Sequence, residues 1–252
     1  MMNNNNLKAQ WKYEENFAFQ GWDFSHIDGR WKSETLPWNY QEIVLSFLKS
    51  TDRLLDMGTG GGECLLSFKH PFALTSVTEA YPPNLEICMK ELAPLGITVV
   101  QAYENDMLSF ENDSFDIVLN RHESFDSAEV ARVLKKGGYF ITQQVGGKND
   151  FDLSQRLCMN FAPQFPRHTL KNNTDAVRLS GFEIEKEEEA FTPVRFFDVG
   201  ALVYFAKIIE WEFSDFSVDN SFDSLLRCQK EIEEIGFVQG TEHRFIIVAR
   251  KI

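Results

Sequence analysis

An apolar strand that runs directly into a glycine-rich turn is the feature that most constrains how this chain can fold. Residues 54–63 have the sequence LLDMGTGGGE, so the apolar run ends at Met57 and glycines dominate the turn after it. Glycine adopts positive φ readily and has no Cβ, so a ligand can approach the main chain closely there. In open α/β sheets, ligands bind at the carboxyl ends of strands. We therefore expect a ligand at the bend formed by Gly58, Thr59 and Gly60.

Short apolar strands alternate with helix-like stretches from about residue 53 to residue 145. This alternation is typical of successive βα units around a parallel sheet, with right-handed crossovers that place helices on both faces. The predicted strands are residues 53–57, 73–78, 97–102, 115–119 and 139–145. The predicted helices between them are residues 62–68, 83–92 and 127–134.

The segments on either side of this core carry weaker signals. Aromatic residues crowd the stretch from Trp11 to Tyr40, which predicts a packed helical cap because so aromatic a segment does not stay disordered. An apolar helix is predicted at 199–209, and no linker rich in Pro, Gly or Ser interrupts the chain. We therefore predict one domain, 1–252, with a cap or lid at 1–50, a cofactor-binding core at 51–146, and a substrate-side half at 147–252 containing an insertion at about 191–240.

Charge and cysteine content limit the partners and the compartment. The formal net charge is −13, which repels phosphate backbones at long range and disfavours nucleic acid as a substrate. The four cysteines have neither metal-ligand nor disulfide-framework spacing, and the N-terminus lacks a secretory signal. No apolar run approaches the roughly 20 residues that span a bilayer. We expect a soluble, cytoplasmic protein without a metal or a membrane partner; the oligomeric state stays open.

Two common glycine-rich turns do not match the sequence. The dinucleotide-binding fingerprint needs a third glycine three places after its second, and Glu63 stands at that position when counted from Gly60. A phosphate-binding loop ends in Lys followed by Ser or Thr, which are absent here. A nicotinamide-dependent oxidoreductase is therefore disfavoured, although tight binding of NAD would revive it.

What remains is an acidic residue, Asp56, followed by glycines at alternate positions, with a second acidic residue, Glu79, near the end of the second predicted strand. This arrangement resembles the first motifs of the class I S-adenosylmethionine-dependent methyltransferases. The resemblance implies that the bend Gly58–Gly60 passes under the amino-acid part of the cofactor. It also implies that Glu79 accepts hydrogen bonds from both ribose hydroxyls, a task that suits an ionised carboxylate.

Two further segments extend the resemblance to about residue 145. The family commonly has an acidic residue followed by a small one where Glu104 and Asn105 stand, ahead of a segment similar to DSFDIV at 113–118. The resemblance implies that one of Glu104, Asn105 and Asp106 contacts the adenine amine and leaves open which one does. Residues 132–138 resemble the family's turn into the fifth strand, with Lys136 where proline is usual.

The resemblance also implies a fold: a Rossmann-like sheet of seven mostly parallel strands with helices on both faces. Residues 182–188 would be the sixth strand and 244–249 an antiparallel seventh beside it, separated by an insertion at 194–237 on the substrate side. The acidic run 185–189 is expected to be a solvated strand end or turn. The N-terminal segment would close over the cofactor with Trp38 near the sulfonium, where cation–π attraction favours a positive sulfur.

The function implied is methyl transfer from S-adenosylmethionine to a small or medium-sized acceptor. The cofactor supplies the electrophile, so the protein orients, excludes water and in some enzymes removes a proton. After the fourth strand, Asn120 is a candidate cofactor contact and His122 a candidate general base, since the ordinary pKa of histidine is near neutrality. An RNA or protein methyltransferase and a non-catalytic cofactor-binding protein remain alternatives, and the nucleophilic atom stays open.

Overall fold

The computed structural model describes residues 3–19, 24–102 and 107–252. The chain divides into two compact units, each assembled from segments that are distant in the sequence. The first, which we call the helical unit, consists of Met1–Leu36, Gly147–Arg167 and Ala190–His243. The second, which we call the sheet unit, consists of Pro37–Gly146, His168–Glu189 and Arg244–Ile252.

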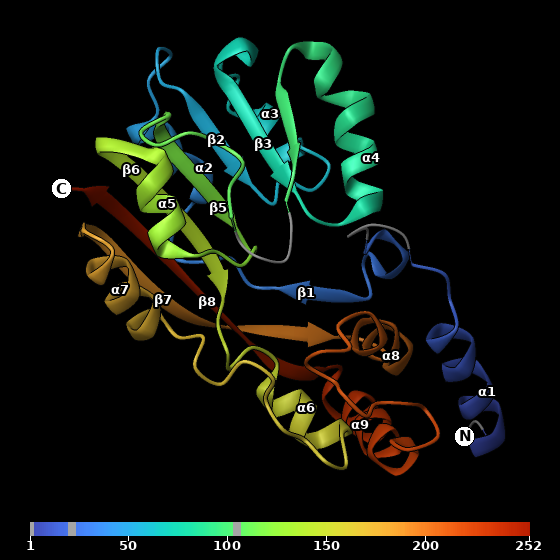
Figure 1. The fold of residues 1–252 in the computed structure, drawn as a ribbon. Coiled ribbons are helices and arrows are strands. Elements are labelled where there is room, and N and C mark those ends of the chain that lie inside the picture. The colour runs from blue at the N-terminus through green and yellow to red at the C-terminus, as the bar shows by residue number, and fades with distance from the viewer. Residues whose placement is uncertain (1–2, 20–23, 103–106) are drawn as a thin grey trace. The chain divides into compact units, whose positions relative to one another are not determined.

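The sheet unit contains a doubly wound α/β core (Figure 1). Strands β4, β3, β2, β5 and β6 pair in parallel in that order, and β8 then pairs antiparallel with β6. The last strand, β8, therefore runs opposite to its neighbour β6 and lies between β6 and β7, which confirms the prediction of an antiparallel last strand beside the sixth. The strands are β2 (Leu54–Met57), β3 (Thr75–Glu79), β4 (Thr98–Gln101), β5 (Phe115–Arg121), β6 (Leu134–Val145), β7 (Phe182–Phe196) and β8 (Val238–Lys251).

The sheet has eight strands, one more than the seven expected. The additional strand, β1 (Trp31–Ser33), pairs antiparallel with the part of β7 that belongs to the helical unit. The acidic run Glu185–Glu189 lies inside β7, so the prediction of a strand end or turn there is wrong. Its glutamates at alternate positions are exposed, and strand periodicity lets such a run continue with its acidic side chains in water.

Helices in the sheet unit pack along the strands that precede or follow them (Figure 1). Helix α4 contacts β3 and β4, whereas α5 contacts β6 and α7. Asp126 begins α5 by accepting hydrogen bonds from the amides of Ala128 and Glu129, and proline occupies the first turn of α4. The helices are α2 (Tyr40–Phe47), α3 (Glu63–Ser67), α4 (Pro82–Glu91), α5 (Ser127–Val133) and α7 (Leu170–Leu179), with short 3-10 helices η2 (Phe72–Leu74) and η3 (Ala93–Leu95).

Each unit has its own apolar core. In the sheet unit, strand residues such as Leu55, Val118 and Phe140 cluster with Val130 of α5 and Val177 of α7. All four residues of β2 are buried, as expected for a parallel strand covered on both faces. This double coverage explains why β2 stands out in the sequence as an apolar run.

The N-terminal aromatic residues build much of the core of the helical unit. Trp11 of α1 packs on Phe222 of α9, and Trp31 stacks on Phe196. Helix α1 also packs against α8, in which Val199 to Ala206 are all buried. Helix α8 has only 10 residues, and no helix in the described part of the chain is long and apolar enough to cross a membrane. The helices are α1 (Asn4–Glu15), η1 (Ser25–Ile27), α6 (Phe151–Leu157), α8 (Val199–Ile208) and α9 (Phe222–Ile235).

Candidate cofactor site

The bend after β2 has the backbone conformation that its glycines predict. Gly58 and Gly60 have φ of +65° and +63°, and Gly62, at +86°, begins α3. The amides of Gly58 and Thr59 both donate to the carbonyl oxygen of Thr78, which ties the bend to the end of β3. A Cβ on Gly60 would meet nothing within 4 Å. The main chain at Gly60 is therefore bare toward open space.

Glu79 reaches this bend from the end of β3. Its side chain is only 4% exposed, and one carboxylate oxygen accepts a hydrogen bond from the Gly60 amide at 2.8 Å. The other oxygen accepts from the Tyr81 amide at 2.9 Å. A carboxylate has about four acceptor positions, so Glu79 can still receive further hydrogen bonds. The structure thus brings together the two elements that the sequence pairs, the bend and Glu79.

A buried carboxyl group and a buried hydroxyl lie at the start of the bend. Burial raises the pKa of Asp56 to about 6, while the nearby charge of Arg121 works in the opposite direction. Tyr40, the first residue of α2, is close enough for the charge of Asp56 to add to the effect of burial in raising the pKa of its phenol. Among the described residues, the Tyr40 hydroxyl has no hydrogen-bond partner. This pair can receive a ligand that carries both a positive charge and a hydrogen-bond acceptor.

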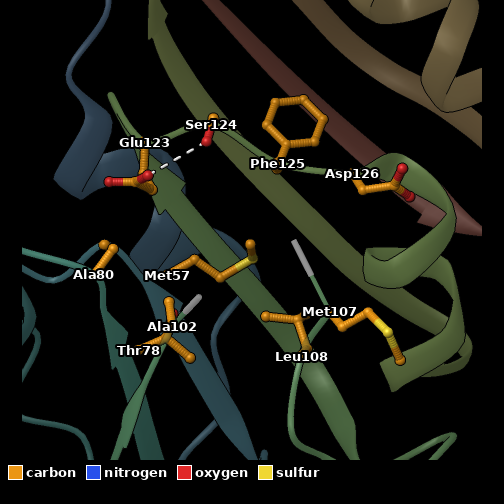
Figure 2. A pocket seen from close by; sticks show the side chains of 11 residues that line it. Met57, Thr78, Ala80, Ala102, Met107, Leu108, Glu123, Ser124, Phe125 and Asp126 are labelled. Carbon is orange, nitrogen blue, oxygen red and sulfur yellow. Dashed lines mark hydrogen bonds between the residues drawn. The ribbon is translucent and has the colours of Figure 1, made fainter. Parts of the chain in front are cut away.

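A cavity of about 350 Å³ opens beside the bend, at the carboxyl ends of four neighbouring strands (Figure 2). Its walls mix apolar side chains with a few polar groups, as ligand pockets generally do. Alanines at 80 and 102 leave room after β3 and β4, and Leu108 closes the apolar side. The lining residues are Met57, Gly58, Thr78, Ala80, Ala102, Met107, Leu108, Glu123, Ser124, Phe125 and Asp126.

Glu123, two residues beyond β5, lies against the bend and lines the cavity. A Cβ placed on Gly58 would be 2.5 Å from the Glu123 Cβ and 2.9 Å from its Oε2. The Ser124 hydroxyl donates to the other carboxylate oxygen at 3.4 Å, as Figure 2 shows. Glu123 therefore adds negative charge above the first glycine. In the sequence, the signal for Glu123 is its place just after the end of the fourth strand, where residues that orient an acceptor are expected.

Asn120, at the end of β5, belongs to a buried polar network. Its Oδ1 accepts hydrogen bonds from the Thr142 hydroxyl at 2.9 Å and from Gln144 Nε2 at 2.5 Å. The side-chain oxygen of Gln144, Oε1, lies 3.2 Å from His168 Nε2. Asn120 is completely buried, and its Nδ2 has no partner among the described residues. The network fixes this amide with its NH₂ group available to donate.

His122 and Trp38 meet on Gln143, which projects to the opposite side of β6 from Gln144. Trp38 is buried, donates to Gln143 and is not among the residues that line the cavity. His122 has φ of +66° and, taken with its backbone, is an exposed residue. Desolvation of the imidazole, followed by the charges of Arg244 and Arg121, lowers the pKa of His122 to about 3, so the imidazole is neutral at physiological pH.

The structure gathers most of the predicted site residues in the sheet unit. Asp56, Gly58, Thr59, Gly60, Glu79 and Asn120 lie at the carboxyl ends of adjacent strands. The predicted adenine contacts Glu104, Asn105 and Asp106 lie outside the described residues. Within the residues that are described, no three His, Cys, Asp or Glu side chains gather as a metal site.

The parallel order from β4 to β6, the antiparallel β8 beside β6 and the glycine bend after β2 define a Rossmann-like fold of the methyltransferase type. Residues 55–142, which contain the bend and the ends of four strands, match the family model described as a methyltransferase domain. These residues include most of the segments that carry the resemblance to the class I S-adenosylmethionine-dependent methyltransferases. A search of curated proteins finds no match to the sequence.

Solved structures share this fold at low sequence identity. A candidate methyltransferase from Bacillus halodurans C-125 is 16% identical with a TM-score of 0.58, covering 84% of this chain and 98% of that one. An S-adenosylmethionine-dependent methyltransferase from Methanosarcina mazei is 16% identical with a TM-score of 0.51, covering 87% and 99%. Geranyl diphosphate methyltransferase, in complex with GPP and sinefungin, is 15% identical with a TM-score of 0.51, covering 84% and 77%. At these identities the likeness establishes the fold alone.

Proposed function

We propose that this protein binds S-adenosylmethionine at the bend after β2 and transfers its methyl group to a small or medium-sized acceptor. The observation that carries the proposal is the meeting of the Glu79 carboxylate with the Gly60 amide on a bare glycine bend beside a cavity. The match of residues 55–142 to a methyltransferase domain supports the same conclusion.

The residues present fit both halves of this cofactor. For the adenosine half, Ala102 and Leu108 offer an apolar wall, and Glu79 offers acceptors for ribose hydroxyls. For the methionine half, the buried Tyr40 hydroxyl can donate to a carboxylate, and Asp56 can face an ammonium group. The cavity, at about 350 Å³, is within the range of small-molecule pockets.

Charge at the bend favours a cationic ligand. When bound, the cofactor supplies a methyl group activated by attachment to a positively charged sulfur. Glu123 lies over Gly58, so its carboxylate faces the part of the site that we assign to the methionine half. Opposite charges attract more strongly where protein displaces water, so Glu123 and Asp56 would favour a ligand with positive charge there.

The chain's own share in the reaction is to bind, to orient and to exclude water. In-line displacement needs the acceptor atom close to the methyl group and aligned with the bond that breaks. Asn120 is placed to contribute, because its buried amide is held by Thr142 and Gln144 with an NH₂ group left to donate. The net charge of −13 supports a small acceptor over RNA, whose phosphates the protein repels at long range.

The proposal is tested in two stages. Calorimetric titration with S-adenosylmethionine and S-adenosylhomocysteine comes first, and binding of neither at millimolar concentration would overturn the proposal. Transfer of labelled methyl to a panel of carboxylates, phenols and amines comes next, with RNA and protein as alternative acceptors. Label in a small molecule supports the proposal. Label only in RNA or protein contradicts the acceptor class, and binding without any transfer favours a non-catalytic role.

A further inference from the structure

A chain of three hydrogen-bonding side chains runs from Trp38 through Gln143 to His122. Trp38 Nε1 lies 2.8 Å from Gln143 Oε1, and both side chains are buried. An indole nitrogen can only donate a hydrogen bond. The contact with Trp38 therefore fixes which end of the Gln143 amide is oxygen and turns its NH₂ group away from the indole.

The second contact fixes the protonation of His122. Gln143 Nε2 lies 3.2 Å from His122 Nε2, and an amide nitrogen only donates. His122 Nε2 must therefore be the acceptor, and a neutral ring then carries its proton on Nδ1. The backbone also holds the pair together, since the His122 amide donates to the Gln143 carbonyl oxygen at 2.8 Å.

Positive charge from two strands works against a second proton on this ring. Arg121 is the last residue of β5 and directly precedes His122. Arg244 of β8 pairs with Val145 in β6. Residues two apart in a strand share a face, so Arg121, Gln143, Val145 and Arg244 all belong to one side of the sheet. Both arginines act in the direction that keeps His122 neutral.

We infer that Trp38 and Gln143 hold His122 as a neutral donor through Nδ1–H, so that His122 positions the methyl acceptor and does not remove its proton. This inference rests on the proposed function, and it replaces the role of general base with that of a positioning residue. His122 is an exposed residue and can offer Nδ1–H to a ligand, and the two arginines favour a negative one. The acceptor class that fits is a small molecule with an anionic oxygen, such as a carboxylate, next to the atom that is methylated.

The tautomer is measured by NMR on the full chain labelled with ¹⁵N-histidine, with His122→Asn identifying the His122 signals among the five histidines. The expected result is a proton on Nδ1 and a neutral ring from pH 5 to pH 8. Gln143→Glu replaces the donor with an acceptor, so the proton should move to Nε2 and the ring should charge at higher pH. Gln101→Glu, an exposed change at the end of β4, is the charge control and should leave the ring unchanged.

Two outcomes of this experiment would overturn the inference: a proton on Nε2 in the unmodified protein, or no response of the ring to Gln143→Glu. Calorimetry with S-adenosylhomocysteine separates this failure from failure of the proposed function. If the protein binds that compound but His122 carries its proton on Nε2, only the inference is contradicted. If His122 carries its proton on Nδ1 but the protein binds neither cofactor nor product, the proposed function is contradicted.

Kinetics with an anionic acceptor distinguish a donor from a base. Asparagine tolerates positive φ and can donate from a position near that of Nδ1, but it is no base at neutral pH. His122→Asn should therefore keep kcat within about fivefold, whereas His122→Phe should raise the KM for the acceptor at least tenfold. Loss of kcat by a factor of 100 or more in His122→Asn would show that His122 acts as a general base.

Discussion

Asp56, in β2 of the sheet unit, and Asp198, at the start of α8 in the helical unit, have pKa values that their surroundings shift in opposite directions. Burial works to raise the pKa of Asp198, but hydrogen bonds from Arg30 outweigh it and hold the pKa below its ordinary value. Arg30 also binds Glu14 at 2.8 Å, and Glu14 contacts His26. Asp56 has no such ion pair among the described residues, and burial raises its pKa to about 6.

The difference distinguishes charged groups that stabilise the fold from charged groups that are placed to bind a ligand. In the helical unit, Arg30 binds two carboxylates, from α1 and from the start of α8, and His26 contacts the first of them, so each carboxylate has a basic partner within the protein. At the glycine bend, Asp56 is buried with only the Thr59 hydroxyl and the more distant charge of Arg121 to offset burial, and the Tyr40 hydroxyl has no partner among the described residues. Strongly shifted ionisable groups gather at binding sites for this reason. The contrast assigns the first cluster to stability and the second to binding.

The sharpest test of this contrast is Gly58→Ala. The new Cβ would lie 2.5 Å from the Glu123 Cβ, and an L-residue at this positive φ is strained by about 1–2 kcal/mol. We expect affinity for S-adenosylhomocysteine to fall at least 100-fold in calorimetry. Gly181→Ala is the control, since Gly181 has φ of +89° and open space around its Cβ position. Equal affinities of the two variants would contradict the assignment of the bend.

In the helical unit, Arg30→Met should affect stability and leave binding unchanged. The change leaves the Glu14 carboxylate, which is 7% exposed, without its guanidinium. Removing one partner of a buried pair costs about 3 kcal/mol, which urea denaturation would show as a lower free energy of unfolding. Arg227→Met, at an exposed position in α9, should change it by less than about 0.5 kcal/mol. A large loss of cofactor affinity in Arg30→Met would contradict the assignment of the Arg30 cluster to stability alone.

The acidity of Asp56 predicts how binding depends on pH. A bound ammonium group favours the ionised carboxylate, so affinity for S-adenosylhomocysteine should rise roughly tenfold from pH 5 to pH 7 and then level off. Calorimetry in buffers of different ionisation heat counts the proton released. Asp56→Asn should give weaker binding that is flat over this range. A flat profile in the unmodified protein would exclude a charge contact at Asp56.

The same shift has the opposite effect on the stability of the ligand-free protein. The folded pKa, about 6, is above the ordinary value of 3.8, so the folded state binds the proton more tightly. This contribution is fully present below about pH 4 and is lost as the pH rises through 6, at a cost of about 3 kcal/mol. Urea denaturation at pH 4 and pH 7 measures how the free energy of unfolding changes between the two pH values. The Asp56→Asn variant lacks the titrating group and should not show this change.

The sequence predicts β2 and β5 well because these central strands are largely buried and mainly apolar. The expected strand 53–57 is β2 (Leu54–Met57), and 115–119 lies inside β5 (Phe115–Arg121). Continuation of β7 to Phe196 was not predicted, because its acidic alternation resembles a solvated end. Strand β1 was missed since a strand of three residues owes its existence to pairing with a distant segment.

The candidate site divides in the same way. Asp56, Gly60 and Glu79 stand out because the glycine-rich bend and the second acidic residue follow each other in the order that the family resemblance implies, and the structure brings the bend and Glu79 together. Tyr40 and Glu123 come from segments whose positions only the folded chain defines. The tautomer of His122 depends on two contacts that no spacing in the sequence encodes.

A crystal structure with S-adenosylhomocysteine tests the central claim most directly. We predict both ribose hydroxyls within hydrogen-bonding distance of the Glu79 carboxylate, with the amino-acid part over Gly58 and Gly60. Product bound elsewhere would contradict this claim. So would a ribose that makes no contact with Glu79 while that carboxylate keeps only the amides of Gly60 and Tyr81.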